Sequence, residues 1–138
     1  MALPNQKFRE IVFQLLYSRD MGNPHSEDII PMIMKELAVS KKSVLEAQEV
    51  VEKIQKHQPE IDAKIAASSN AYDFDRIHSV ERNILRLGIY EMLFDDNIPE
   101  KVAISEAMRL AKKFSSGDAR AFVNAIMDRI LREKTQEA

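Results

Sequence analysis

The stretch Ser79–Phe94, SVERNILRLGIYEMLF, carries apolar residues around most of its circumference when it is drawn as a helix. Ile84 and Leu87 lie on one stripe of that helix, and Leu85 and Ile89 lie on another. A helix with one apolar stripe lies on a surface, whereas a helix that is apolar on most sides is enclosed by its neighbours. We therefore expect residues 79–94 to form a buried central helix around which the other elements pack.

Apolar residues recur at helical spacing through the rest of the chain as well. Breakers and capping residues separate the expected helices, which cover approximately residues 5–21, 26–37, 40–57, 59–69, 79–94, 99–114 and 118–134. Pro59 is expected to begin a new helix, and Pro31 is tolerated only within a first turn. We expect residues 71–78 to form a connection that Tyr72, Phe74 and Ile77 anchor.

These segments predict an all-α bundle of about seven short helices joined by short loops. The chain has 138 residues, of which 45 % are hydrophobic, so it can bury a real core as one domain or as two small halves sharing a core. A buried charge needs a partner. We expect Arg86 and Glu91 to form ion pairs that tie the central helix to its neighbours.

Several classes of site lack the residues that they require. The chain has no Cys, which excludes disulfides and thiolate chemistry, and His25, His57 and His78 are isolated from one another. Neither a Gly-rich phosphate loop nor a nucleophile motif is present, so we expect no catalytic residue, no metal ligand and no cofactor. The N-terminus has no signal-peptide core and no segment has the length of a membrane span, which favours a soluble, cytoplasmic protein without membrane contact.

Charge is distributed unevenly along the chain. Residues 101–134 contain eight basic and four acidic side chains, whereas residues 20–100 contain nine basic and sixteen acidic ones. If the first and last helices lie side by side, their cations form a patch that attracts a phosphate backbone. Tyr17 and Phe122 could then stack on unpaired bases. The alternative is that both rings belong to the core and the charges form a solvated face.

Three stretches of the chain resemble the NusB family. Residues 79–114 are similar to its C-terminal signature, and residues 118–128 have its Phe-Val-Asn-x-apolar-apolar-Asp form. Arg9-Glu10, followed by FQLLY at residues 13–17, resembles its first helix. The order and spacing of the three stretches agree with the family, and the resemblance covers residues 79–128 and 7–21.

This resemblance implies a transcription antitermination factor with no enzymatic activity and no cofactor. Such a factor pairs with the ribosomal protein NusE, and the pair binds the single-stranded boxA sequence of nascent rRNA. The complex helps RNA polymerase to read through terminators. The implied fold has two small helical bundles around the central helix. We expect these bundles at residues 1–70 and 71–138, within one compact domain. We expect the protein to be a monomer or a weak homodimer.

The resemblance also implies RNA contacts at five positions in the first and last helices, namely Lys7, Arg9, Tyr17, Asp118 and Phe122. Glu81, early in the central helix, matches a position near the NusE and RNA surface and is expected to bind the partner. The N-terminal segment PNQKFRE has fewer cations than the Arg-rich run of many family members. Fewer phosphate contacts imply weaker RNA binding by the chain alone and a shallower salt dependence.

Two other interpretations stay open at this point. One is an RNA-targeting domain like the NusB-like module of some rRNA methyltransferases, although the chain ends at Ala138 without a methyltransferase region. The other is a protein-interaction scaffold or homodimer whose RNA surface has degenerated, which the thin N-terminal basic run would fit.

Overall fold

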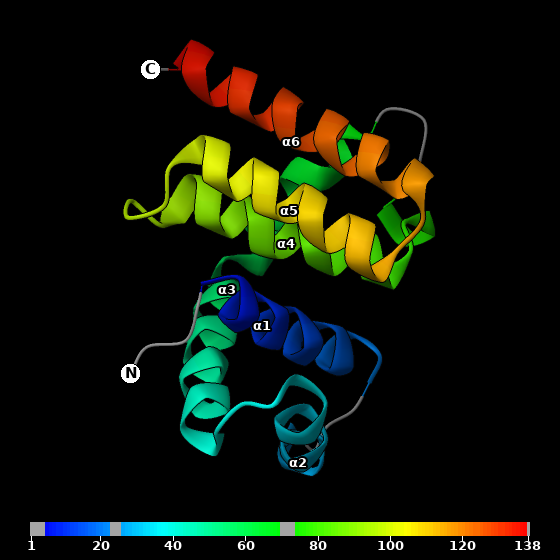
Figure 1. The fold of residues 1–138 in the computed structure, drawn as a ribbon. Helices are drawn as coiled ribbons and strands as arrows, with labels where there is room; N and C mark the ends of the chain where they lie inside the picture. Colours follow the sequence, from blue (N-terminus) through cyan, green and yellow to red (C-terminus); the bar gives the residue numbers. More distant parts are fainter. Residues whose placement is uncertain (1–4, 23–25, 70–73, 138) are drawn as a thin grey trace. The chain divides into compact units, whose positions relative to one another are not determined.

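The computed structural model describes residues 5–22, 26–69 and 74–137 (Figure 1). Within these ranges all regular structure is helical, which confirms the predicted all-α class. The α-helices are α1 (Asn5–Asp20), α2 (Ser26–Leu37), α3 (Lys41–Ser68), α4 (Ser79–Phe94), α5 (Glu100–Phe114) and α6 (Gly117–Glu137). A 3-10 turn, η1 (Phe74–Arg76), precedes α4. His25 and Tyr72, which the sequence analysis singled out, lie outside the described residues.

The described helices number six rather than about seven, because α3 continues through Pro59. The expectation that Pro59 begins a new helix is therefore wrong. Proline cannot donate a hydrogen bond to the preceding turn, but Pro59 lies on an exposed face of the helix. The buried stripe of Ile54, Ile61 and Ile65 continues on both sides of it, each side chain 0 % exposed. Burial of this stripe outweighs the one missing backbone hydrogen bond.

Pro31 also lies inside a helix, beyond the first turn of α2. The expectation that it is tolerated only in a first turn is wrong for the same reason. Pro31 is exposed, while its neighbours Ile29, Ile30 and Ile33 are at most 8 % exposed. The apolar face of α2 is thus buried despite the missing donor.

The contacts within the chain divide it into two compact units, residues 1–56 and residues 57–138. The boundary lies within α3. The first unit contains α1, α2 and the beginning of α3, and α1 contacts α2. Its buried side chains include Ile11 and Leu15 of α1. The division that we expected from the sequence, between residues 70 and 71, stays a prediction.

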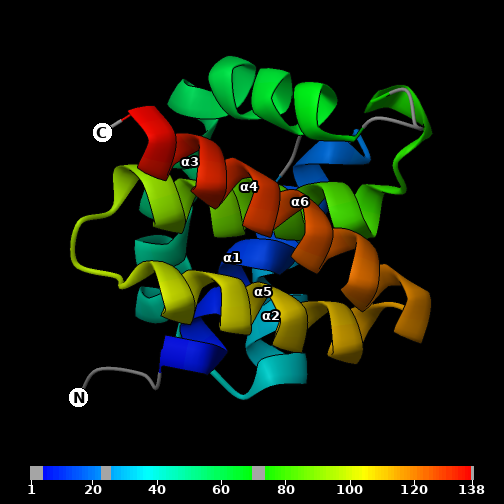
Figure 2. The same cartoon turned by 90° about the horizontal axis from the view of Figure 1, so that it is seen from above.

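In the second unit, α4, α5 and α6 contact one another (Figure 1 and Figure 2). The buried character predicted for residues 79–94 is confirmed, since Ile84, Leu85 and Ile89 of α4 are 0 % exposed. Gly88 lets the three helices approach closely. A Cβ atom at Gly88 would lie 3.0 Å from Met127 Cε and 3.2 Å from Ala107 Cβ.

In the described ranges, no helix combines the length and the hydropathy that crossing a membrane would require.

Candidate nucleic-acid interface

The second unit contains an open surface pocket of about 300 Å³. One side comes from η1 and the residues before α4, and the other comes from the beginning of α6. The lining consists of Arg76, Ile77, His78, Glu81, Ser116, Asp118, Ala119 and Phe122. The pocket therefore brings together three residues that the sequence analysis assigned to binding, namely Glu81, Asp118 and Phe122.

Phe122 is half-buried and lines this pocket. The next core positions of α6, Val123 and Ile126, are at most 2 % exposed. The side chain of Phe122 thus lies between the core face of α6 and solvent, rather than fully in either. An aromatic ring at the edge of a pocket offers a surface on which a base can stack.

Asp118 is exposed and lies in the first turn of α6. An acidic residue at that position interacts favourably with the positive end of the helix dipole. Its carboxylate also lines the pocket, where it contributes negative charge. The same residue therefore stabilises the helix start and adds one negative charge to the site.

Glu81 is only 9 % exposed, although it also lines the pocket. Ser115 Oγ donates a hydrogen bond to Glu81 Oε1 at 3.0 Å, which links the first turn of α4 to the end of α5. Glu81 is thus a buried acceptor at the base of the pocket, and its carboxylate is held in place by α5.

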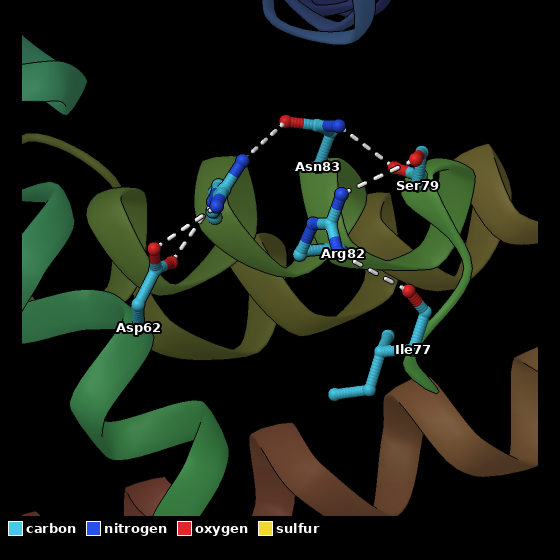
Figure 3. Close-up of polar contacts among 6 residues, drawn as sticks. Asp62, Ile77, Ser79, Arg82 and Asn83 are labelled. Atoms are coloured by element: carbon cyan, nitrogen blue, oxygen red, sulfur yellow. Dashed lines mark hydrogen bonds and ion pairs between the residues drawn. The ribbon is translucent and has the colours of Figure 1, made fainter. Parts of the chain in front are cut away.

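The wall of the pocket at residues 76–78 is fixed to α4 by Arg82 (Figure 3). Arg82 Nη1 donates to the backbone carbonyl of Ile77 at 3.4 Å, and Arg82 Nη2 donates to Ser79 Oγ at 3.2 Å. Asn83 Nδ2 donates to the backbone carbonyl of Ser79 at 2.7 Å. Arg82 therefore holds the segment that leads into the helix, whereas the bond of Asn83 lies within the first turn of α4.

Arg86 extends this network to the end of α3. Its Nε and Nη2 atoms donate to the two carboxylate oxygens of Asp62, each at 2.9 Å, and its Nη1 donates to Asn83 Oδ1 at 3.1 Å. The ion pair expected for Arg86 is confirmed. The ring of Phe74 lies 5.8 Å from Arg86 Cζ and 5.5 Å from Arg82 Cζ, within the range of cation–π attraction. Glu91 is buried, and the ion pair expected for it stays a prediction.

The other expected RNA-binding residues belong to α1, in the first unit, and do not line this pocket. Lys7 and Tyr17 are half-buried, and Arg9 is only 6 % exposed. The ring of Tyr17 lies 6.1 Å from that of Phe13, as its spacing of four residues on a helix requires. Lys7 is therefore the more accessible of the two cations at the beginning of α1.

The sequence analysis missed Arg76 and His78, the two exposed basic residues of the pocket lining. Both lie in the connection before α4, where no helical periodicity relates them to residues of α6. Only their proximity in the folded chain associates them with Phe122. The single available signal was the pair of basic residues in an otherwise acidic segment of sequence.

Fold and pocket together define an all-helical binding protein whose site combines an aromatic ring with charges of both signs. The model of the NusB family matches residues 6–132, nearly the whole chain. The chain belongs to the NusB family. This is a family of transcription antitermination proteins, and it is not enzymatic.

Relatives and solved structures agree with this assignment. The transcription antitermination protein NusB of Chlamydia pneumoniae is 36 % identical over 132 residues, which cover 96 % of this chain and 82 % of the relative. A crystal form of T. maritima NusB is 32 % identical with a TM-score of 0.78, covering 96 % of this chain and 94 % of that one. A structure of antitermination factors NusB and NusE in complex with dsRNA is 26 % identical with a TM-score of 0.78, covering 94 % and 96 %.

Proposed function

We propose that this chain is a transcription antitermination factor that binds the boxA sequence of nascent rRNA together with NusE. The bound complex supports read-through of terminators by RNA polymerase. The observation that carries the proposal is the family match over residues 6–132. The likeness to a NusB that was solved with NusE and dsRNA supports the choice of partners.

The pocket of the second unit is the RNA-contacting part of this proposal. Phe122 stacks on a base, while Asp118 lies beside the bound strand and Glu81 lies at the edge of the NusE contact. Lys7, with Arg9 and Tyr17 of α1, contributes further contacts to the RNA. The half-buried ring of Phe122 in an open pocket supports this assignment, because stacking needs one accessible face.

The proposal extends to the setting in which the chain acts. A protein that binds nascent rRNA works in the cytoplasm, and it acts as a monomer or a weak homodimer that associates with NusE. We also propose one compact domain with subdomains at residues 1–70 and 71–138.

A binding titration tests the function directly. A labelled RNA that carries boxA, and a scrambled RNA of the same composition, are titrated with this protein in the presence and absence of purified NusE. Fluorescence anisotropy at several salt concentrations gives the affinity. We expect NusE to bind the protein and to raise its affinity for boxA more than for the scrambled RNA. The proposal fails if NusE neither binds nor raises the affinity for RNA.

Phe122→Ala tests the stacking contact. We expect the affinity for boxA to fall by roughly 1–3 kcal/mol, the usual contribution of a base stacked on an aromatic ring, while the protein stays folded. Leu131→Ala is the matched control, because Leu131 is half-buried on the same helix and lies outside the pocket. Urea unfolding of both variants measures any loss of stability. Lost stability in Phe122→Ala without a separate binding defect would indicate a purely structural role.

A further inference from the structure

Arg76 brings a positive charge into a pocket whose lining also contains two carboxylates and the imidazole of His78. It is the last residue of η1 and is exposed, whereas Glu81 and Asp118 contribute the negative charges of the lining. Arginine matches phosphate particularly well, because its planar guanidinium can donate two parallel hydrogen bonds to phosphate oxygens. The pocket thus combines a group suited to a phosphate with a ring suited to a base.

The backbone that carries Arg76 is held at several points. The N–H of Ile77 donates to the carbonyl of Phe74 at 3.1 Å, which closes the turn around Arg76. The carbonyl of Ile77 accepts a hydrogen bond from Arg82, as Figure 3 shows. The ring of Phe74 lies 5.5 Å from Arg82 Cζ, which holds the other end of the turn. A cation on a fixed segment loses less conformational freedom on binding than one on a mobile loop.

The charges of the pocket orient a nucleotide within it. A phosphate is repelled by the carboxylate of Asp118 at the beginning of α6 and attracted by the guanidinium of Arg76 at the end of η1. A base is neutral and can lie against Phe122. The volume of about 300 Å³ is at the lower limit of ligand pockets, so it suits one unpaired nucleotide rather than a duplex.

We propose that Arg76 binds the phosphate of a nucleotide whose base occupies the pocket against Phe122. This inference rests on the proposed RNA-binding function and adds a phosphate contact that the sequence did not reveal. The inference assigns the two kinds of contact to different residues. Arg76 binds a phosphate of the RNA backbone and so positions the strand, and Phe122 contacts the base.

The salt dependence of binding distinguishes these contacts. The full chain and its variants are titrated with boxA RNA over a salt series, and log K is plotted against log[salt]. Arg76→Gln removes one phosphate contact, so the slope should become shallower by about 0.7, with affinity lowered for boxA and scrambled RNA alike. Phe122→Ala should lower the affinity and leave the slope unchanged.

Arg132→Gln is the matched control, because Arg132 is an exposed cation on α6 that pairs with Asp128 at 3.0 Å. It loses the same charge outside the pocket, and its slope should equal that of the unchanged protein. Equal slopes for Arg76→Gln and the unchanged protein would overturn the inference, and so would equal changes in Arg76→Gln and Arg132→Gln.

Arg76→Lys covers the case in which Arg76→Gln impairs folding. It keeps the charge and loses the planar donor pair, so the slope should be retained while the affinity falls. A slope that becomes shallower in Arg76→Lys as well would overturn the inference, because the charge is still present. If the unchanged protein binds no RNA under any condition, the proposed function itself fails, which is a different result from an unchanged slope in Arg76→Gln.

Discussion

Gly88 shows how one residue sets the spacing of three helices. An added Cβ atom would lie 3.0 Å from Met127 Cε and 3.2 Å from Ala107 Cβ, so these neighbours would have to shift, and Met127 is 0 % exposed. Gly88→Ala gains up to about 1 kcal/mol of helix propensity. Overpacking a core costs about 1–3 kcal/mol, so we expect a net loss of about 1 kcal/mol in the free energy of unfolding.

Urea denaturation of Gly88→Ala measures that loss. Gly117→Ala is the control, because Gly117 is exposed and a Cβ atom there would have no neighbour within 4 Å. Its free energy of unfolding should stay the same or rise. A more stable Gly88→Ala would show that the second unit relaxes around the extra methyl group, contrary to the tight packing argued above.

Asp118→Asn should affect binding and stability in opposite directions. The carboxylate of Asp118 is exposed beside the pocket and repels phosphate, so its removal should raise RNA affinity by up to about 1 kcal/mol at low salt, less at high salt. The start of α6 should lose about 0.3–1 kcal/mol of stability. Anisotropy titrations and urea unfolding measure the two effects. Asp128→Asn is the control, because Asp128 lies on the same helix but outside the pocket, and it should leave RNA affinity unchanged. Weaker RNA binding by Asp118→Asn would mean that the carboxylate of Asp118 accepts a hydrogen bond from a base.

The sequence predicts the position of a site residue better when the residue lies in a helix than when it lies in a connection. Phe122 could be assigned to a helix, but whether its ring faces core or solvent depends on which neighbours cover that side, and it lies between the two. Arg9 is 6 % exposed, which the sequence did not show, because burial depends on the packing of the whole unit. Its contact with RNA stays a prediction. Arg76 lines the pocket because of the turn at η1, and no periodic pattern in the sequence predicts this turn.

Among the elements, α4 was predicted with the bounds that the structure has, Ser79–Phe94. Its residues are apolar on most sides of the helix, and such a helix buries them only when other elements surround it. The single helix α3 was predicted as two helices, because the prediction gave Pro59 more weight than the apolar stripe that continues on both sides of this residue. A local breaker is a weaker signal than a continuous apolar face on both sides of it.

The link between α3 and α4 depends on the pair Asp62–Arg86. The side chain of Arg86 is 6 % exposed and that of Asp62 is 21 % exposed, so removing one partner leaves a nearly buried charge without its counterion. We expect Asp62→Asn to lower the free energy of unfolding by about 1–3 kcal/mol. In an Arg86→Met background the same change should cost much less, and a double-mutant cycle by urea unfolding measures this coupling. Additive losses would show that the pair contributes nothing of its own.

Tyr90 gives the second unit a dependence on alkaline pH. Burial, and then the nearby negative charge of Asp95, raise the pKa of Tyr90 above its ordinary value of 10.0. The folded state therefore keeps the phenol proton to higher pH than the unfolded state does. Above about pH 10 the folded protein binds more protons, so the free energy of unfolding should fall as pH rises through the raised pKa. Below that range Tyr90 contributes no pH dependence.

Tyr90→Phe isolates this contribution from other groups that titrate at alkaline pH. Its ring still packs beside Phe94, which lies 6.2 Å away and stacks on His57 at 4.1 Å. Urea unfolding from pH 8 to about 11 should show a smaller decline for Tyr90→Phe than for the unchanged protein. Asp95→Asn should give an intermediate decline. Parallel curves for all three proteins would mean that the phenol of Tyr90 is solvated as in the unfolded chain.

At the scale of the whole molecule, the net charge of −2 gives no general attraction to a polyanion. RNA binding would then depend on local cations, of which Lys7, Arg9 and Arg76 are those proposed to contact the strand. Lys7 is half-buried, Arg9 is 6 % exposed, and Arg76 is exposed in the pocket. Such a protein differs from one with a broad basic surface, because each phosphate contact can be removed singly and its effect on salt dependence read separately.

We therefore expect the chain alone to bind boxA RNA with a shallow salt dependence, no steeper than a slope of about −3 in log K against log[salt], since each phosphate contact to a single strand contributes about −0.7. Adding NusE should raise the affinity and steepen the slope, because the partner brings its own phosphate contacts.

Lys7→Gln should make the slope of the chain alone shallower by about 0.7. Lys134→Gln is the control, because Lys134 is engaged with Glu100 at 3.4 Å and with the carbonyl of Met92 at 3.3 Å. A slope near −6 for the chain alone would mean that many more cations contact the strand, and the dependence on NusE would then need another cause.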